Sequence, residues 1–186
     1  VHISTDYVFD GNGYCPYPTS YPIAPVSVYG KTKADGENAI VDSGANAVII
    51  RTAWVYSTFG HNFVKTMLRL GQEKPALNVV ADQIGSPTNA ADLAQFIVEN
   101  LLDYKPTGTE IYHYTNEGVC SWYDFAHAIM EMKNLNCVVH PIPTKDYPTP
   151  AKRPFYSVLD KQSTKQKFNI TIPHWRDSLK KCLTSL

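Results

Sequence analysis

The chain has 186 residues, 44% of them hydrophobic, and its 17 basic and 17 acidic side chains give a formal net charge of zero at pH 7. This composition supports an apolar core, and the balanced charge excludes a basic-patch binder of nucleic acid. No apolar stretch approaches the roughly 18 residues that span a bilayer, and no signal peptide or membrane partner is indicated. The scattered cysteines form no Cys-x-x-Cys pair, so we expect free thiols, no metal site and a cytoplasmic location.

The first predicted element is a strand that ends at Ile3 and runs directly into the hydroxyl residues Ser4 and Thr5. In an open parallel sheet, ligands bind beyond the carboxyl ends of the strands, so Thr5 stands where a substrate would meet the sheet. Taken alone, a hydroxyl at a strand exit more often bonds to local backbone. A loop rich in proline and tyrosine follows to Pro25.

The next element is a helix predicted over residues 27–41, ending near Gly44. It carries Tyr29 and Lys33, and a Tyr-x-x-x-Lys spacing puts a phenol and an ammonium on one helical face. An adjacent ammonium favours phenolate, which makes a tyrosine usable as a general acid or base near neutral pH. The spacing alone is weak evidence, but together with Thr5 it favours a catalytic interpretation.

Strands and helices alternate through the rest of the chain. The expected helices include one opened by a capping box of Ser121 and Asp124, and one with Asn89 near its cap. Strands are predicted at 47–51, 77–80, 111–114 and 138–142. The helix capped near Asn89 is predicted at 90–102, and further helices at 62–72, 161–168 and 174–183. This alternation predicts an α/β fold: the C-terminal part of a doubly wound, Rossmann-type parallel sheet with an interleaved smaller α/β substrate-binding domain.

Several sequence blocks resemble the extended short-chain dehydrogenase/reductase family. They are STDYVFDG at 4–11, VYGKTK at 28–33, RTAWVY at 51–56, NF at 62–63, DQIGSPT at 82–88 and RP at 153–154. Within that family the blocks are similar to those of the reductases that convert dTDP-4-dehydro-L-rhamnose into dTDP-L-rhamnose. They keep the family's order over most of the chain, which argues against coincidence.

The resemblance implies an oxidoreductase that transfers hydride from NADPH or NADH to the sugar C4. It also implies that Tyr29 donates a proton, Lys33 holds the nicotinamide ribose and Thr5 hydrogen-bonds the carbonyl oxygen. Expected cofactor contacts are Tyr29, Lys33, Arg51 and Thr52. Expected contacts with the dTDP-sugar substrate are Thr5, Asp6, Tyr7, Trp54, Asn62, Gln83, Ser86, Thr88 and Arg153.

Structural roles remain open for several of these residues. Trp54 follows a buried strand and suits either core packing or stacking on the sugar. Gln83, Ser86 and Thr88 lie in a segment whose glycine and proline would serve any tight loop. Arg153 matches a pyrophosphate or is simply solvated.

The family begins with a glycine-rich turn that holds the cofactor pyrophosphate, and no Gly-x-x-Gly-x-x-Gly occurs here. We therefore expect the C-terminal part of a longer enzyme, inactive alone and prone to form homo-oligomers through an unpaired strand edge. Residues 1–80 are interpreted as the remaining C-terminal half of the dinucleotide-binding domain with the Tyr/Lys helix, and 81–186 as mainly the substrate-binding domain, with interleaved segments and an approximate boundary. The proline-rich segment 141–154 is interpreted as a lid. The sequence does not decide whether NADPH or NADH is the preferred cofactor, and it gives no support for a magnesium requirement.

Other functions within and outside this family were weighed on single residues. The related 4,6-dehydratases place Glu directly after the Thr-Asp pair, where this chain has Tyr7, and a phenol cannot easily replace a carboxylate in that proton transfer. The complete 4–11 block argues against 4-epimerases. A non-catalytic regulatory subunit resembling that of methionine adenosyltransferase, and a purely structural scaffold, remain alternatives. The retained Thr5, Tyr29 and Lys33 favour an enzyme.

Overall fold

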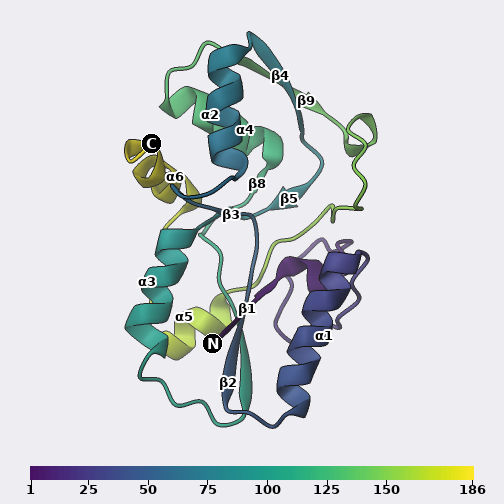
Figure 1. The fold of residues 1–186 in the computed structure, drawn as a ribbon, viewed down its shortest axis with the longest axis vertical. Helices are drawn as coiled ribbons and strands as arrows, with labels where there is room; N and C mark the ends of the chain where they lie inside the picture. Colours follow the sequence, from purple (N-terminus) through teal and green to yellow (C-terminus); the bar gives the residue numbers. More distant parts are fainter.

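The computed structural model describes residues 1–186 and shows an α/β fold with two regions, one built on a parallel sheet and one on packed helices (Figure 1). The sheet contains β1 (His2–Thr5), β2 (Ala47–Thr52) and β7 (Thr109–His113) in the order β1-β2-β7, and both pairings are parallel. The predicted α/β class is confirmed. All three strands end at one edge of the sheet, where polar residues that follow them can meet a ligand.

Helices cover both faces of this sheet, which we call the sheet region. α1 (Val28–Asp42) packs on the face that carries Arg51, which pairs with a carboxylate of that helix. α3 (Ala90–Leu101) and α5 (Gln162–Phe168) pack on the other face, where Ile50 belongs to an apolar cluster. Figure 1 shows α1 on one side of the strands and α3 and α5 on the other. This arrangement follows from the alternation of strand side chains between the two faces.

The second region, which we call the helical region, holds the larger core. Its elements are α2 (Phe63–Glu73), β4 (Ala76–Val80), α4 (Trp122–Met132), β9 (Val138–Ile142) and α6 (Trp175–Thr184). β4 and β9 pair in parallel beside α2 and α4. The core cluster contains 16 buried hydrophobic residues, against eight in the cluster beside the sheet, so apolar burial is concentrated here.

Short elements connect the two regions. β3 pairs with β6 in parallel, and β5 pairs with β8 in antiparallel fashion. The short strands are β3 (Val55–Tyr56), β5 (Ile84–Gly85), β6 (Thr88–Asn89) and β8 (Cys120–Ser121), and the 3-10 helices are η1 (Asp6–Val8) and η2 (Thr144–Asp146). These short elements were not predicted from the sequence, because two or three residues are too few to show a hydrophobic period.

The longer helices and strands lie within two residues of their predicted bounds. Their capping residues are confirmed as well. Asn89 accepts the N–H of Ala91 at the start of α3, and Ser121 and Asp124 form the predicted capping box at the start of α4. None of the helices has the length and apolar character that crossing a membrane requires.

The elements do not separate at residue 80, where the two predicted domains meet. α2 and β4 precede that residue yet pack with α4 and β9. β7 follows it yet pairs with β2. The functional division between cofactor and substrate domains stays a prediction, but in space the sheet region and the helical region each draw on both halves of the chain.

Candidate active site

Thr5 links the end of β1 to η1. Its hydroxyl oxygen accepts the N–H of Tyr7 at 3.2 Å, and its hydroxyl donates to Oδ1 of Asp6 at 3.0 Å. In the sheet register Thr5 lies beside Thr52 of β2. Thr5 therefore stands at the carboxyl edge of the sheet, as the sequence predicted, but with its hydroxyl already hydrogen-bonded and only 5% of the residue exposed.

The start of α1 packs closely against η1. Gly30 permits this approach, because a Cβ at that position would collide with the carbonyl oxygen of Tyr7. Next to it, Tyr29 is 55% exposed, and its ring meets the Tyr7 ring edge to face with centroids 5.6 Å apart. One turn later, Lys33 Nζ donates to the carbonyl oxygen of Ile3 at 2.5 Å. These contacts bring Tyr29, Lys33 and the end of β1 together, with the phenol open to solvent.

Asp6 lies inside the protein, so its position does not support the direct substrate contact expected from the sequence. It is 3% exposed, and its second carboxylate oxygen, Oδ2, has no hydrogen-bond partner. Burial raises the pKa of Asp6 to about 7, against smaller lowering effects of Thr5, its own backbone and Ser157. The site thus contains a buried carboxyl group that changes charge near neutral pH.

Arg51 has a structural role, and the cofactor contact expected of it is not supported by its geometry. The side chain is 1% exposed, and its guanidinium binds both carboxylate oxygens of Glu37 at 2.6 to 3.1 Å. A third nitrogen, Nη1, donates to the carbonyl oxygen of Thr19. Thr52, the other expected cofactor contact, is buried, and its hydroxyl donates to Thr88 at 3.2 Å.

Trp54 follows β2 in a strained backbone conformation, with φ at +50°. Its indole stacks on that of Trp122, with centroids 3.6 Å apart and planes 10° from parallel. It also packs closely on Gly85, where a Cβ would lie 2.7 Å from Cε2 of the indole. Trp54 is half-buried and borders the helical core. The structure therefore gives it a packing role, while leaving part of the side chain accessible.

A cavity of about 640 Å³ opens beside this stack, between α2, β4 and the segment that follows η2. Gln83 and Arg153, both predicted from the sequence, line it together with Trp122. Arg153 also acts to lower the pKa of Tyr7, although burial and Asp6 raise that pKa overall. Arg153 thus lines the cavity and also influences Tyr7 electrostatically.

Three other predicted substrate contacts are engaged in internal hydrogen bonds. Asn62 caps α2, where it accepts the N–H of Lys65, and its amide donates to the carbonyl oxygen of Ser57 at 2.7 Å. Ser86 and Thr88 are fully buried and donate at 2.7 Å to the carbonyl oxygens of Gly118 and Ala53. Their side chains hold the connections between regions together and do not line the cavity.

Most residues of the cavity wall were not predicted from the sequence. The apolar side of the cavity is formed by Phe63, Met67, Leu70, Leu77 and Trp122, and its open side includes Tyr147 and Thr149. The sequence does indicate that the α2 residues share one face, because they recur at the helical spacing of three to four positions. No such signal connects α2 with Trp122 or Tyr147, which are far away in sequence.

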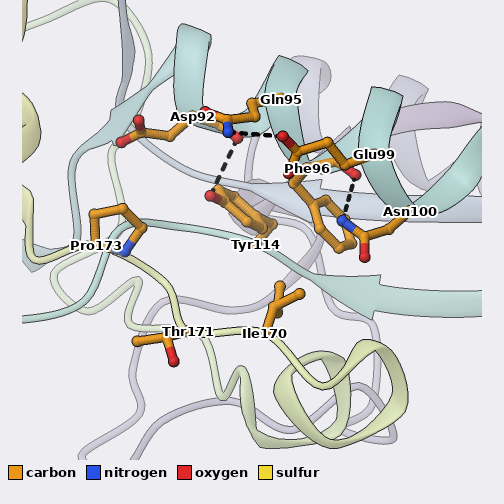
Figure 2. A pocket seen from close by; sticks show the side chains of 9 residues that line it. All are labelled: Asp92, Gln95, Phe96, Glu99, Asn100, Tyr114, Ile170, Thr171 and Pro173. Atoms are coloured by element: carbon orange, nitrogen blue, oxygen red, sulfur yellow. Dashed lines mark hydrogen bonds between the residues drawn. The ribbon is translucent and has the colours of Figure 1, made fainter.

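A smaller cavity of about 120 Å³ lies in the sheet region between α3 and residues 170–173 (Figure 2). Tyr114 donates to the carbonyl oxygen of Asp92 there, and Gln95 donates to Glu99. None of the predicted site residues lines this cavity. Its size and its shape suit water better than a nucleotide.

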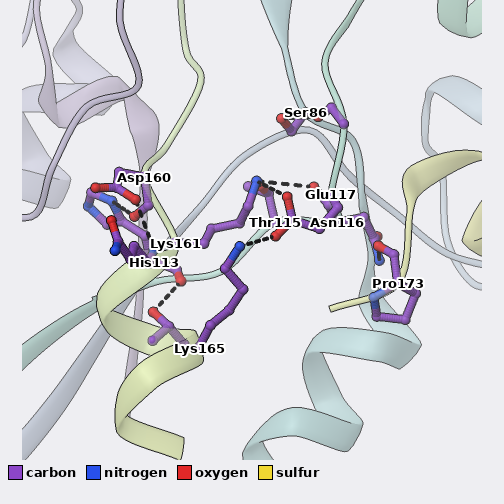
Figure 3. A network of polar contacts seen from close by, with 12 residues as sticks. Ser86, His113, Thr115, Asn116, Glu117, Asp160, Lys161, Lys165 and Pro173 are labelled. Carbon is purple, nitrogen blue, oxygen red and sulfur yellow. Dashed lines mark hydrogen bonds and ion pairs between the residues drawn. The ribbon is translucent and has the colours of Figure 1, made fainter. Parts of the chain in front are cut away.

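A buried polar network ties α5 to the loop after β7 (Figure 3). Lys161 is 7% exposed and lies 3.5 Å from a carboxylate oxygen of Glu117, which also pairs with Lys165 at 2.8 Å. Beside it, burial lowers the pKa of His113 to about 3, and its Nδ1 is 3.1 Å from the carbonyl oxygen of Asp160. Apart from Nε2 of His113, which has no hydrogen-bond partner, these polar groups bond to one another or to nearby backbone and link α5 to the loop after β7.

Comparison with known proteins gives consistent matches. A family model described as the RmlD substrate binding domain matches residues 1–186. The chain is 46% identical over 98% of its length to the spore coat polysaccharide biosynthesis protein SpsK of Bacillus subtilis, and 40% identical over its whole length to dTDP-4-dehydrorhamnose reductase of Escherichia coli. The crystal structure of dTDP-4-dehydrorhamnose reductase from Bacillus anthracis in complex with NADP superimposes with a TM-score of 0.94 over the whole chain, at 37% identity. The chain spans 63% to 65% of the length of these three proteins.

Proposed function

The chain belongs to the family of RmlD substrate-binding domains, and from this membership we propose that it carries the proton-donating and substrate-binding residues of a dTDP-4-dehydrorhamnose reductase. The substrate would be a dTDP-linked 4-keto-6-deoxy sugar, and the cofactor NADPH or NADH. Two relatives carry the reductase name, and one of them was solved with NADP. Because the chain spans less than two thirds of their length, the complete reaction is proposed for the protein that contains all of the cofactor-binding elements.

The convergence of three residues carries this proposal. Thr5 and Tyr29 stand 24 positions apart, yet the close packing of η1 on α1 brings them to the same edge of the sheet. Lys33 is anchored to β1 by its bond to Ile3, which keeps the ammonium on the same side as the phenol. An exposed phenol beside a hydroxyl and an ammonium suits protonation of a carbonyl oxygen.

In the proposed reaction, Tyr29 donates its phenolic proton to the carbonyl oxygen as that oxygen becomes an alkoxide. Thr5 donates a hydrogen bond to the same oxygen and stabilises its developing charge. When bound, the reduced nicotinamide supplies the hydride to the carbon. Tyr29 and Lys33 are available to bind the nicotinamide ribose. Tyr29 is exposed, and the Lys33 ammonium lies on the same helical face.

The 640 Å³ cavity is proposed to take the nucleotide end of the substrate. Trp122 and Phe63 offer aromatic surface to a base, and their rings lie 4.7 Å apart. Arg153, at the open side, offers a planar cation to the pyrophosphate.

The test is a reductase assay on the complete protein with the dTDP-4-keto-6-deoxy sugar and NADPH or NADH. Consumption of the reduced nicotinamide, followed by its absorbance, together with formation of the 4-hydroxy sugar, is the expected result. Parallel reactions with EDTA and with added magnesium test metal dependence. If both ligands bind but no product forms in any of these reactions, the proposed reductase function is wrong and a binding role is favoured.

A further inference from the structure

Asp6 is the one buried acidic group beside the proposed site that the reaction does not use. Its carboxylate is almost fully buried; Oδ1 accepts the hydroxyl of Thr5 at 3.0 Å, and Oδ2 has no partner. Burying an ionised carboxylate with an unpaired oxygen is costly, and such a group in a native fold requires an explanation. No cation is among the groups that set its pKa, so an ion pair does not explain it.

The explanation follows from the hydrogen-bonding capacity of Thr5. A hydroxyl has one proton and two lone pairs. One lone pair of Thr5 accepts the N–H of Tyr7, and the proton is donated to Asp6. While Asp6 is ionised it can only accept, so the Thr5 hydroxyl has no proton left for a substrate oxygen.

Protonation of Asp6 changes this arrangement. A protonated carboxyl group has an O–H of its own, which can donate to the second lone pair of Thr5. The Thr5 hydroxyl then accepts from Tyr7 and Asp6 and is free to donate its proton outward. In this state both the O–H of Asp6 and the hydroxyl proton of Thr5 have acceptors once a carbonyl oxygen lies next to Thr5, and no ionised carboxylate is buried.

We propose that Asp6 is a positioning residue that sets the direction in which the Thr5 hydroxyl donates: inward when Asp6 is ionised, and toward the substrate carbonyl oxygen when Asp6 is protonated. The inference rests on the proposed role of Thr5 in carbonyl reduction. It assigns Asp6 a function through Thr5 rather than a contact with the substrate, which agrees with its burial.

The surroundings of Asp6 allow both states near neutral pH. Burial is the largest influence and raises its pKa to about 7, so the protonated form dominates below that pH and the ionised form above it. Thr5, the Asp6 backbone and Ser157 oppose burial and lower this pKa to a smaller extent. Charged and titratable side chains on the neighbouring elements include Tyr7 in η1, Tyr29 and Lys33 in α1, and Arg153 in the segment after η2. His2 in β1, and the paired Glu37 of α1 and Arg51 of β2, are further charged or titratable groups on these elements.

The first test needs no activity and uses the 186-residue chain. The side-chain carboxyl ¹³C resonance of Asp6 is followed by NMR against pH and assigned through its correlations with the Cβ and backbone resonances of Asp6. We expect a midpoint near 7, and a still higher midpoint in Thr5→Val, because that variant removes a donor that stabilises the ionised form. A midpoint below pH 5, or one that Thr5→Val leaves unchanged, would overturn the proposal.

The second test measures kcat against pH in the complete reductase. Because the protonated fraction of a group with a pKa near 7 falls about tenfold between pH 6 and pH 8, kcat is expected to fall by about that factor. Asp6→Asn should remove this fall, since an amide does not titrate, whereas Asp10→Asn, a partly exposed control outside the site, should keep it. Asp6→Asn should also have no effect on the pH profile of Thr5→Val, because Asp6 acts through that hydroxyl.

The two tests separate failure of this inference from failure of the proposed function. If no reduction occurs in the wild type, the reductase function is wrong, and the NMR midpoints still decide whether Asp6 and Thr5 are coupled. If reduction depends on Tyr29 but the fall of kcat persists in Asp6→Asn, the reductase function holds and the positioning role of Asp6 is wrong. Should Asp6→Asn fail to fold, the wild-type midpoint and its response to Thr5→Val decide alone.

Discussion

The sheet region and the helical region bury different kinds of side chain. The sheet region buries charged and titratable groups, among them the Arg51–Glu37 pair, Asp6 and His113. The helical region buries a core of 16 hydrophobic residues and opens a cavity of about 640 Å³ beside it. In the proposed enzyme, the first region therefore handles protons, and the second recognises the shape of a large ligand.

The two regions should therefore respond differently to single substitutions. A buried charge depends on a specific partner, so removing one partner leaves the other uncompensated. Apolar burial scales with contact area, so replacing one side chain of an apolar cavity wall removes only that side chain's share of the area. The predictions below test this contrast, from the largest expected effect to the smallest.

Tyr29→Phe should have the largest effect, and on catalysis alone. Loss of a general acid typically lowers the rate by about 10²–10⁴-fold, so kcat in the complete reductase should fall by that factor. The ring is retained and the hydroxyl belongs to an exposed side chain, so the midpoint of thermal unfolding should stay unchanged. Tyr14→Phe, at a residue that is 92% exposed, is the matched control. A Tyr29→Phe enzyme with turnover within a few-fold of wild type would remove Tyr29 from the mechanism.

Glu37→Gln should have the largest effect on stability. It leaves the buried Arg51 guanidinium without its counter-charge, and breaking a buried pair in this way costs about 3–5 kcal/mol. Glu73→Gln is the control, because its pair with Arg69 is exposed and is worth about 0–1 kcal/mol. Urea unfolding of both variants measures the difference. Similar losses in the two variants would contradict the structural role given to Arg51.

Trp122→Leu should weaken binding of the nucleotide sugar more than binding of the cofactor. It removes the stacking partner of Trp54 and part of the cavity wall. Aromatic pairs contribute about 0.5–1.5 kcal/mol beyond their buried area, which corresponds to a loss of roughly two- to tenfold in affinity. Calorimetry with dTDP-sugar and with NADPH on the complete protein measures both. Equal losses for the two ligands would mean that Trp122 supports the fold generally.

Trp54→Ala tests whether the indole beyond β2 contacts the substrate. If it does, sugar-nucleotide affinity should fall while cofactor affinity is kept. Its stacking on Trp122 also predicts a loss of thermal stability, so both quantities are measured on the same variant. Unchanged substrate affinity with a large loss of stability would make Trp54 a packing residue only.

His113→Asn should change how the stability of the fold depends on pH. The folded state keeps His113 neutral down to a pKa of about 3, whereas the unfolded chain takes up a proton near pH 6.5. The unfolded state thus binds more protons in this window, and this group makes stability fall as pH is lowered from 6.5, by at most about 1.4 kcal/mol per pH unit. Asp6, whose pKa is raised, contributes the opposite slope between about 4 and 7.

The His113 contribution is isolated by comparing urea unfolding of wild type and His113→Asn at several pH values. The variant should lose less stability on acidification than the wild type. His140→Asn, at an exposed histidine in β9, should follow the wild type. Parallel curves for wild type and His113→Asn would show that this buried imidazole does not determine the acid sensitivity.

The sequence alone determined the local elements and one half of the proposed site. The helices, the longer strands, the caps at Asn89 and Ser121, and the shared face of Tyr29 and Lys33 all depend on residues within a few positions of each other. Hydrophobic period, capping and helical spacing are therefore readable from the chain. Thr5 was found for the same reason, because a strand end is a local feature.

Only the tertiary structure decided which of the other candidates are available to a ligand. Arg51 belongs to a block that resembles the family, yet it is buried by Glu37, 14 positions away. Trp54 meets Trp122 across the two regions, and the cavity wall combines α2 with residues after η2. Asp6 has an ordinary polar context in the sequence, and only its burial gives it a pKa near 7. Contacts between distant residues, and the desolvation they cause, depend on how the whole chain packs, and no local pattern of residues encodes them.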